Sequence, residues 1–247
     1  MNKISIILPT FNEAENIVPL IKTIQKVVKN PKEILIIDDN SPDGTASLAH
    51  KYKKQYKAKN ISVIVRYKNR GLTNSIRDGI KHAKGDIVVW MDCDFSHPPK
   101  MINKLVEKIN DGYDIAVCSR FIKGGGFKGK EEENLLAMTL SRLMNYTIQF
   151  ILNRNFKDYT SGFIAAKKSI FKKIKLRGDY GEYFIDLIYK SLAYDYKITE
   201  IPFINMPRAK GQSKTGNNLF DYIMRGRKYI MISFKLLIEK HIQHKLP

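Results

Sequence analysis

Two carboxylates one residue apart, Asp92 and Asp94, directly follow the apolar run from Ile87 to Met91. Side chains two positions apart at the end of a strand point the same way and can face one pocket. Mg²⁺ and Mn²⁺ prefer oxygen ligands, and one or two carboxylates plus substrate phosphates commonly hold such an ion. An ion there would neutralise a diphosphate leaving group. A solvated turn is the alternative, and the preceding apolar run favours the metal site.

A second acidic pair, Asp38 and Asp39, ends the apolar run from Ile34 to Ile37. A carboxylate at this place can accept hydrogen bonds from a ribose or a base. We expect that role for Asp39. Asp43 lies in the turn from Ser41 to Gly44, where capping the turn or the next helix is the simpler interpretation.

Three basic residues are candidates for phosphate contacts: Arg120, Arg208 and Lys214. Arginine matches phosphate oxygens with two parallel hydrogen bonds, and lysine supplies a point charge. Arg120 ends an apolar run, and the other two flank the segment 211–213, which has the composition of a flexible loop. His97 has two interpretations, orienting Asp94 or capping the next helix.

Several enzyme classes are excluded by missing motifs. The segment 9–13 after the first apolar run contains no glycine, which excludes a dinucleotide-binding fingerprint and the phosphate loop of ATPases. No Gly-x-Ser-x-Gly motif occurs, which argues against a serine hydrolase.

The elements that must position these residues alternate between short apolar runs and amphipathic stretches. This pattern predicts an α/β fold with a mostly parallel twisted sheet flanked by helices, whose ligands bind at the carboxyl ends of the strands. The expected strands are 4–8, 34–37, 61–65, 86–91 and 115–119, with later ones at 163–166 and 198–201. The expected helices are 13–28, 47–56, 72–83, 98–110, 135–152 and a basic amphipathic one at 217–244. The glycine- and charge-rich segment 123–133 is expected to be a mobile loop.

Length and composition indicate one catalytic domain, 1–215, and a basic amphipathic helical tail, 216–247. The chain has 247 residues, 43% of them hydrophobic, and a formal net charge of +19, which indicates an anionic partner. Two cysteines give no disulfide framework, so we expect a reducing compartment. We find neither a signal peptide nor a run of about 20 apolar residues. The sequence therefore predicts a cytoplasmic protein that is soluble or peripheral to a membrane.

Taken together, the motifs resemble those of the dolichol-phosphate mannosyltransferases, within the family 2 glycosyltransferases of the GT-A fold. The resemblance covers roughly residues 4–215. The matching stretches are 9–16, 38–45, 91–99, 119–121, Ser141-Arg142 with Asn145, 160–163, and Arg208 with Gly211, Ser213 and Lys214.

The resemblance implies a role for each matching position. The nucleoside would contact Pro9, Phe11, Glu13, Ile37 and Asp39. The sugar nucleotide and metal would contact Asp92, Cys93 and Asp94, and Ser96 stands where the family often has a glutamine as an extra metal ligand. The donor and acceptor phosphates would bind Arg120, Arg208 and Lys214, with Ser141 and Arg142 on the acceptor phosphate.

The chain departs from the family's pattern at three places. Gly71-Leu72-Thr73 replaces a Gly-Leu-Gly, and the segment 131–137 lacks the tryptophan and arginine usual in the acceptor loop. A Phe-x-x-Glu motif becomes the segment 184–187 or is lost. These differences bear on the sugar and the acceptor more than on the reaction.

The function implied by the resemblance is inverting transfer of a hexose, mannose from GDP-mannose, to a polyprenyl or dolichyl monophosphate with Mg²⁺ or Mn²⁺. A phosphate acceptor arrives largely ionised near pH 7, so no general base is needed. The helix 135–152 and the basic tail would dock on an anionic membrane at its cytoplasmic face, alone or with a membrane-anchoring partner protein. The alternatives are a family 2 transferase that uses a UDP-sugar and, in another class, a basic nucleic-acid-binding module. We expect no nucleic-acid partner, because strand-end carboxylates would repel phosphates.

Overall fold

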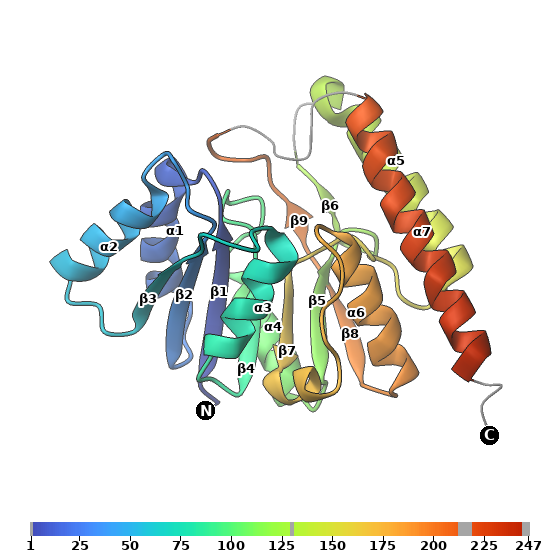
Figure 1. The fold of residues 1–247 in the computed structure, drawn as a ribbon, viewed down its shortest axis with the longest axis horizontal. Helices are drawn as coiled ribbons and strands as arrows, with labels where there is room; N and C mark the ends of the chain where they lie inside the picture. The colour runs from blue at the N-terminus through green and yellow to red at the C-terminus, as the bar shows by residue number, and fades with distance from the viewer. Residues whose placement is uncertain (1, 129–130, 212–218, 244–247) are drawn as a thin grey trace.

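A seven-stranded sheet forms the centre of the computed structural model, which describes residues 2–128, 131–211 and 219–243 (Figure 1). Its strand order is β3-β2-β1-β4-β7-β5-β8, and all neighbours are parallel except that β7 runs antiparallel to both β4 and β5. The strands are β1 (Ile4–Thr10), β2 (Lys32–Asp38), β3 (Ile61–Val65), β4 (Ile87–Trp90), β5 (Ile115–Ser119), β7 (Ile164–Lys167) and β8 (Ile198–Pro202). A separate parallel pair, β6 (Gly126–Phe127) with β9 (Ile204–Asn205), stands beside this sheet.

Helices cover both faces of the sheet, which explains why its strands read as continuous apolar runs. Along β1, Ile4, Ile6 and Leu8 are buried under one helical layer, whereas Ile7 is buried under the other. The first layer is α1 (Ala14–Val27), α2 (Thr45–Gln55) and α4 (Met101–Asn110), and the second is α3 (Leu72–His82) and α6 (Glu182–Ala193). A short 3₁₀ helix, η1 (Lys168–Lys172), follows β7.

Two long helices lie side by side at one end of the molecule, α5 (Glu131–Ile151) and α7 (Leu219–Gln243) (Figure 1). α7 packs against α5 and α6, and Leu236 of α7 is buried in the same core as α6. Within the described ranges, neither these helices nor any other is long and apolar enough to cross a bilayer.

The strand ends that carry the predicted site meet at one edge of the sheet. Thr10 is paired with Asp38, so β1 and β2 end together, and β4 lies parallel beside β1. Because β7 is antiparallel, its first residue lies at this edge, and the loop that precedes it joins the loops that follow the parallel strands.

The predicted fold class is confirmed, and the predicted elements agree with the observed ones to within a few residues, except in the second half. The segment 123–133 is not only a loop, because it contains β6 and the first turn of α5. The sequence reading missed α6, β9 and the antiparallel direction of β7. The proposed boundary at 215/216 lies outside the described residues and stays a prediction.

Candidate active site

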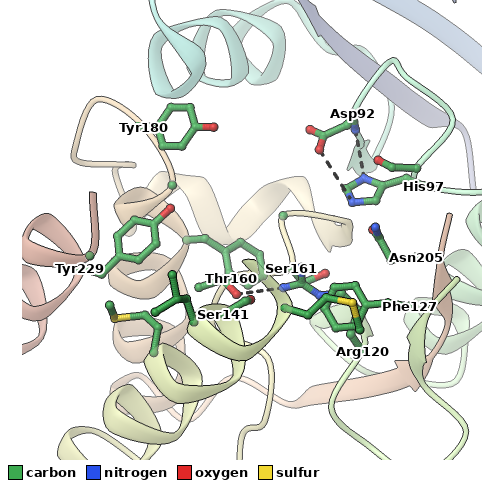
Figure 2. Close-up of a pocket in the computed structure, with 18 of the residues that line it drawn as sticks. Asp92, His97, Arg120, Phe127, Ser141, Thr160, Ser161, Tyr180, Asn205 and Tyr229 are labelled. Atoms are coloured by element: carbon green, nitrogen blue, oxygen red, sulfur yellow. Dashed lines mark hydrogen bonds and ion pairs between the residues drawn. The ribbon is translucent and has the colours of Figure 1, made fainter. Parts of the chain in front are cut away.

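A large cavity of about 1280 Å³ opens beyond the carboxyl ends of β4 and β5 and extends between α5 and α7. Figure 2 shows Asp92 and His97 on one side of it and Tyr180 and Tyr229 on the other. The sheet end contributes mostly polar groups, whereas α5 and α7 contribute mostly apolar ones. The polar and charged lining residues include Asp92, Asp94, Ser96, Arg120, Lys128, Ser141, Thr160, Asn205, Arg208 and Arg227. The apolar ones include Met138, Leu140, Leu143, Met144, Phe184, Ile230 and Met231.

The Asp92 side chain is 57% exposed, and its exposed surface faces the cavity. Its backbone N–H donates to Nδ1 of His97 at 3.1 Å, so the proton of a neutral His97 ring is on Nε2, 3.9 Å from the Asp92 carboxylate. Burial beside Phe163, which stacks on the ring at 4.8 Å, lowers the pKa of His97 and favours that neutral form. Desolvation by the cavity walls raises the pKa of Asp92, and His97 opposes this shift. His97 therefore contacts both the backbone and the carboxylate of Asp92, and its two predicted roles, orienting Asp94 or capping the next helix, stay predictions.

Asp94 is held on all sides. The backbone N–H and the hydroxyl of Ser96 donate to its Oδ1 at 2.9 and 2.6 Å, and Arg208 lies 2.8 Å from Oδ2. Arg208 also contacts Glu13 at 3.2 Å, which links the end of β1 to the segment after β9. Burial acts to raise the pKa of Asp94, but Ser96 and Arg208 outweigh it and hold that pKa below its usual value.

Arg120, at the end of β5, makes a two-pronged ion pair with the fully buried Asp158, at 2.9 and 2.7 Å. Its Nη2 also donates to the hydroxyl of Thr160 at 2.8 Å (Figure 2). Asn145 of α5 donates to the same hydroxyl at 2.7 Å and accepts the backbone N–H of Tyr159 at 2.8 Å. This network joins α5 to the sheet edge and fixes the direction of the Arg120 guanidinium.

A buried network surrounds Asp39. Arg66 and Ser75 donate to its Oδ1 at 2.6 and 2.9 Å, and the backbone N–H of Gly71 donates to Oδ2 at 2.6 Å. Arg66 also donates to Asp78 at 2.7 Å. The Asp39 carboxylate is thus fixed in orientation by its own chain.

The turn after β2 is explained by local capping. Asp43 accepts the backbone N–H of Thr45 at 3.0 Å and that of Ala14 at 2.9 Å, so it serves the first turns of both α2 and α1. The prediction of a structural role for Asp43 is therefore confirmed. Asp38, with no exposed surface, accepts from Thr10 and Ser41 in the same way.

The predicted site residues fall into three places. Asp92, Asp94, Ser96, Arg120, Ser141 and Arg208 line the cavity. Pro9, Phe11, Glu13, Ile37, Asp39 and Cys93 belong to the neighbouring ends of β1, β2 and β4. The Ile37 side chain is fully buried, so only its backbone can face a ligand. Arg142 lines a smaller cavity of about 230 Å³ with Phe121 and Lys157, and Lys214 lies outside the described residues.

Several cavity residues escaped the sequence reading: Lys128, Tyr180, Arg227 and Tyr229. Tyr229 approaches Gly181 so closely that a Cβ on that glycine would lie 2.1 Å from the phenolic oxygen. No sequence pattern indicates that α7 packs against the loop before α6, so this contact could not be predicted from the sequence.

The donor set fits a hard divalent cation that takes further ligands from a substrate. Asp92 and Asp94 bring two carboxylates to one cavity, which suits Mg²⁺ or Mn²⁺ bound together with phosphates. In the part of the chain that the structure describes, no cluster of three or more acidic, histidine or cysteine side chains has the arrangement of a complete metal site.

The sequence of this chain is similar to the sequences of known glycosyltransferases. The model of the glycosyl transferase family 2 matches residues 5–175. A dolichol-phosphate mannosyltransferase of Pyrococcus furiosus is 36% identical over 223 residues, which are 90% of this chain and 62% of that enzyme. A polyprenol monophosphomannose synthase of Mycolicibacterium smegmatis is 29% identical over 221 residues, 87% of this chain and 82% of that enzyme.

Among solved structures, glucosyl-3-phosphoglycerate synthase from Mycobacterium tuberculosis, in complex with Mn²⁺, UDP and its product, superposes with a TM-score of 0.71. It is 19% identical, and the match covers 95% of this chain and 80% of that one. This likeness confirms the predicted GT-A type of fold. With the match of the family model over most of its length, the chain belongs to glycosyl transferase family 2.

Proposed function

We propose that this protein transfers mannose from GDP-mannose to the phosphate of a polyprenyl or dolichyl monophosphate, with inversion at the anomeric carbon. The observation that carries the proposal is the two-ended cavity, with carboxylates and arginines at the sheet and apolar side chains between α5 and α7. A lipid phosphate has the same two ends. The names of the two mannosyltransferase relatives support this substrate pair.

The donor would lie along the ends of β1, β2 and β4. The nucleoside would meet Pro9, Phe11 and the oriented carboxylate of Asp39. Arg70 covers the Phe11 ring at 5.9 Å and would close this side. When bound, Mg²⁺ or Mn²⁺ on Asp92 and Asp94 would neutralise charge on the diphosphate leaving group.

The acceptor supplies its own nucleophile, because a phosphate monoester is largely ionised near pH 7. The chain then has to align the two substrates and balance their charge, which needs no base. Arg120 and Ser141 line the cavity where an acceptor phosphate would approach. Arg208 bridges Glu13 and Asp94 and lines the same cavity, so it would balance phosphate charge there as a partly neutralised cation.

We also propose docking on an anionic membrane surface at its cytoplasmic face, and exposed apolar side chains on α5 and α7 support the contact with a membrane. Leu143, Tyr146 and Phe150 are spaced along one face of α5, and Met231, Phe234 and Ile238 along one face of α7. Leu143 and Met231 also line the cavity, so the exposed face continues to its opening. The basic segment 216–247 would serve as the docking tail, with or without a membrane-anchoring partner.

The decisive experiment incubates the protein with radiolabelled GDP-mannose, UDP-glucose or UDP-N-acetylhexosamine, each with a polyprenyl phosphate and Mg²⁺. We expect a labelled lipid with GDP-mannose alone, and its loss when EDTA removes the metal. Formation of a labelled lipid only with a UDP-sugar would reject GDP-mannose as the donor and assign the transfer of another hexose. Absence of a lipid product with every donor would reject the acceptor.

A further inference from the structure

We infer that Lys128 and Arg227 form a cationic subsite that binds the phosphate of the lipid acceptor, in addition to Arg120 and Arg208. The inference rests on the proposed transfer to a lipid phosphate. It adds two residues that the sequence motifs do not include.

Two of the cationic side chains predicted to bind phosphate, Arg120 and Arg208, are already paired with carboxylates of the chain. Arg120 is paired with Asp158 through two hydrogen bonds. Arg208 is paired with Glu13 and Asp94 at 3.2 and 2.8 Å. Each guanidinium is therefore largely neutralised before a substrate arrives, so an acceptor carrying almost two negative charges still needs cations.

Lys128 and Arg227 line the same cavity, and both side chains are exposed. Among the described residues, no carboxylate lies within ion-pairing distance of either one. Lys228, the neighbour of Arg227, differs on both counts, because it lies outside the cavity lining and 3.8 Å from Asp179. Of the two neighbours on α7, Arg227 thus faces the cavity and has no described acidic partner, whereas Lys228 lies outside the cavity and has one.

The face of α7 that carries Arg227 distinguishes an acceptor phosphate from a donor phosphate. Arg227, Ile230 and Met231 all line the cavity, and their spacing places them on one side of the helix. Opposite them, Met144 of α5 approaches α7 so closely that a Cβ on Gly226 would lie 2.7 Å from its methyl carbon. A cation followed by apolar side chains along one helix matches an anionic head group followed by a hydrocarbon chain.

Lys128 approaches from the opposite wall. Its backbone N–H donates to the backbone carbonyl of Asn205 at 2.8 Å, which continues the pairing of β6 with β9 and fixes the position of the Lys128 backbone. The preceding residue, Phe127, lies 5.3 Å from the Arg120 guanidinium. Lys128, Phe127 and Arg120 all line the cavity, so Lys128 belongs to the wall that the residues of β6 and the end of β5 form, where the acceptor phosphate has to meet the sugar.

Steady-state kinetics with GDP-mannose and a short, water-soluble isoprenyl phosphate, without vesicles, would test the subsite. In Lys128→Gln and Arg227→Gln we expect the acceptor KM to rise about tenfold or more, the usual effect of losing a charged hydrogen bond. The donor KM should stay unchanged. Inorganic phosphate should compete with the acceptor in the unaltered chain and compete more weakly in both variants. Lys228→Gln is the matched control, and its acceptor KM should equal that of the unaltered chain.

The possible results separate the two claims. Absence of product from the unaltered chain would reject the proposed reaction itself. Product formation with an unchanged acceptor KM in both variants would reject the subsite alone. A rise in the donor KM instead would assign the two cations to the donor diphosphate, and an equal effect of Lys228→Gln would reduce them to general surface charge; either result overturns the inference.

Discussion

The carboxylates of Asp92 and Asp94 are held in different ways, although one residue separates them. Asp94 receives hydrogen bonds from Ser96 and an ion pair from Arg208, whereas Asp92 is exposed to the cavity and has the His97 ring 3.9 Å from its carboxylate. Asp92 is consequently the carboxylate that a cation can reach with the least rearrangement.

Asp92→Asn should lower kcat by about a hundredfold or more, because the position loses the negative charge that holds the metal against the leaving group. Turnover measured across a Mn²⁺ titration checks this. The exposed substitution Asp111→Asn serves as the control. Equal melting temperatures would show that the loss is chemical, and a fully active variant would remove Asp92 from the metal site.

Arg66 stabilises the fold at the donor side of the site, because its guanidinium forms ion pairs with the Asp39 and Asp78 carboxylates. Arg66→Met should reduce the free energy of unfolding by about 3–5 kcal/mol, because it leaves Asp39 buried beside no cation. Chemical denaturation measures this value. Asp78, 41% exposed, is the comparison: Asp78→Asn should cost less than about 1 kcal/mol. Similar small losses in both variants would contradict the account.

For individual residues, the sequence indicated which side chains lie together at the end of the sheet, but it gave little information about their hydrogen-bond and ion-pair partners. The positions of Asp92, Asp94 and Arg120 could be predicted, because each of these residues follows an apolar run that is recognisable in the sequence. Arg66 and Asp158 were missed because each lies in a stretch with no motif, and their partners are 27 and 38 residues away along the chain. Such pairings depend on how the strands are ordered in the sheet.

Among the elements, α7 is attached to the catalytic core through a shared arginine. Arg177, in the segment before α6, lies 2.7 Å from Asp186 of α6 and 2.9 Å from Glu239 of α7. The hydrogen bonds from Arg177 hold the pKa of Glu239 below its usual value. This contact therefore gives the packing of α7 a dependence on pH.

Glu239→Gln should destabilise the protein by up to about 1 kcal/mol near pH 7, because the ion pair is partly exposed. A carboxyl whose pKa is lowered by folding stabilises above its unfolded pKa of about 4.3. The difference between the two proteins should then shrink as the pH falls through the lowered folded value. Thermal unfolding measured from pH 7 down to pH 3 checks this, and a constant difference would contradict it.

Elements buried on both sides were the hardest to read. The strands stood out as short apolar runs, and all seven strands of the main sheet were predicted close to their observed bounds. In α6, every residue from Glu182 to Ile188 is buried, so the helical period is hidden and the sequence reading missed the helix. The antiparallel direction of β7 could not be predicted either, because an apolar run does not indicate whether the neighbouring strands are parallel or antiparallel to it.

For the molecule as a whole, the net charge of +19 and the exposed apolar faces of α5 and α7 are the two properties on which the proposed docking at a lipid surface rests. Charge attracts the protein to an anionic bilayer, and apolar side chains hold it there. Neither property affects the fold, and both were readable from composition and helical spacing.

The paired substitution Phe150→Gln and Phe234→Gln should reduce flotation with vesicles that contain anionic lipid, since these side chains are 72% and 53% exposed on the two helices. Flotation should also weaken as salt is added, because screening shortens the attraction. Tyr194→Gln, an exposed aromatic position on another element, is the control. Equal flotation of all three proteins would place the membrane contact elsewhere.

The antiparallel strand β7 has a further consequence for the chemistry. Neighbouring strands lie about 4.8 Å apart, so this one inserted strand sets the ends of β4 and β5 roughly 10 Å from each other. Without it, the Asp92 and Arg120 backbones would be direct neighbours, and the carboxylate and the guanidinium would neutralise one another. The inserted strand keeps these opposite charges apart at a distance into which a sugar and a phosphate fit, and its preceding loop gives Arg120 a different counterion, Asp158.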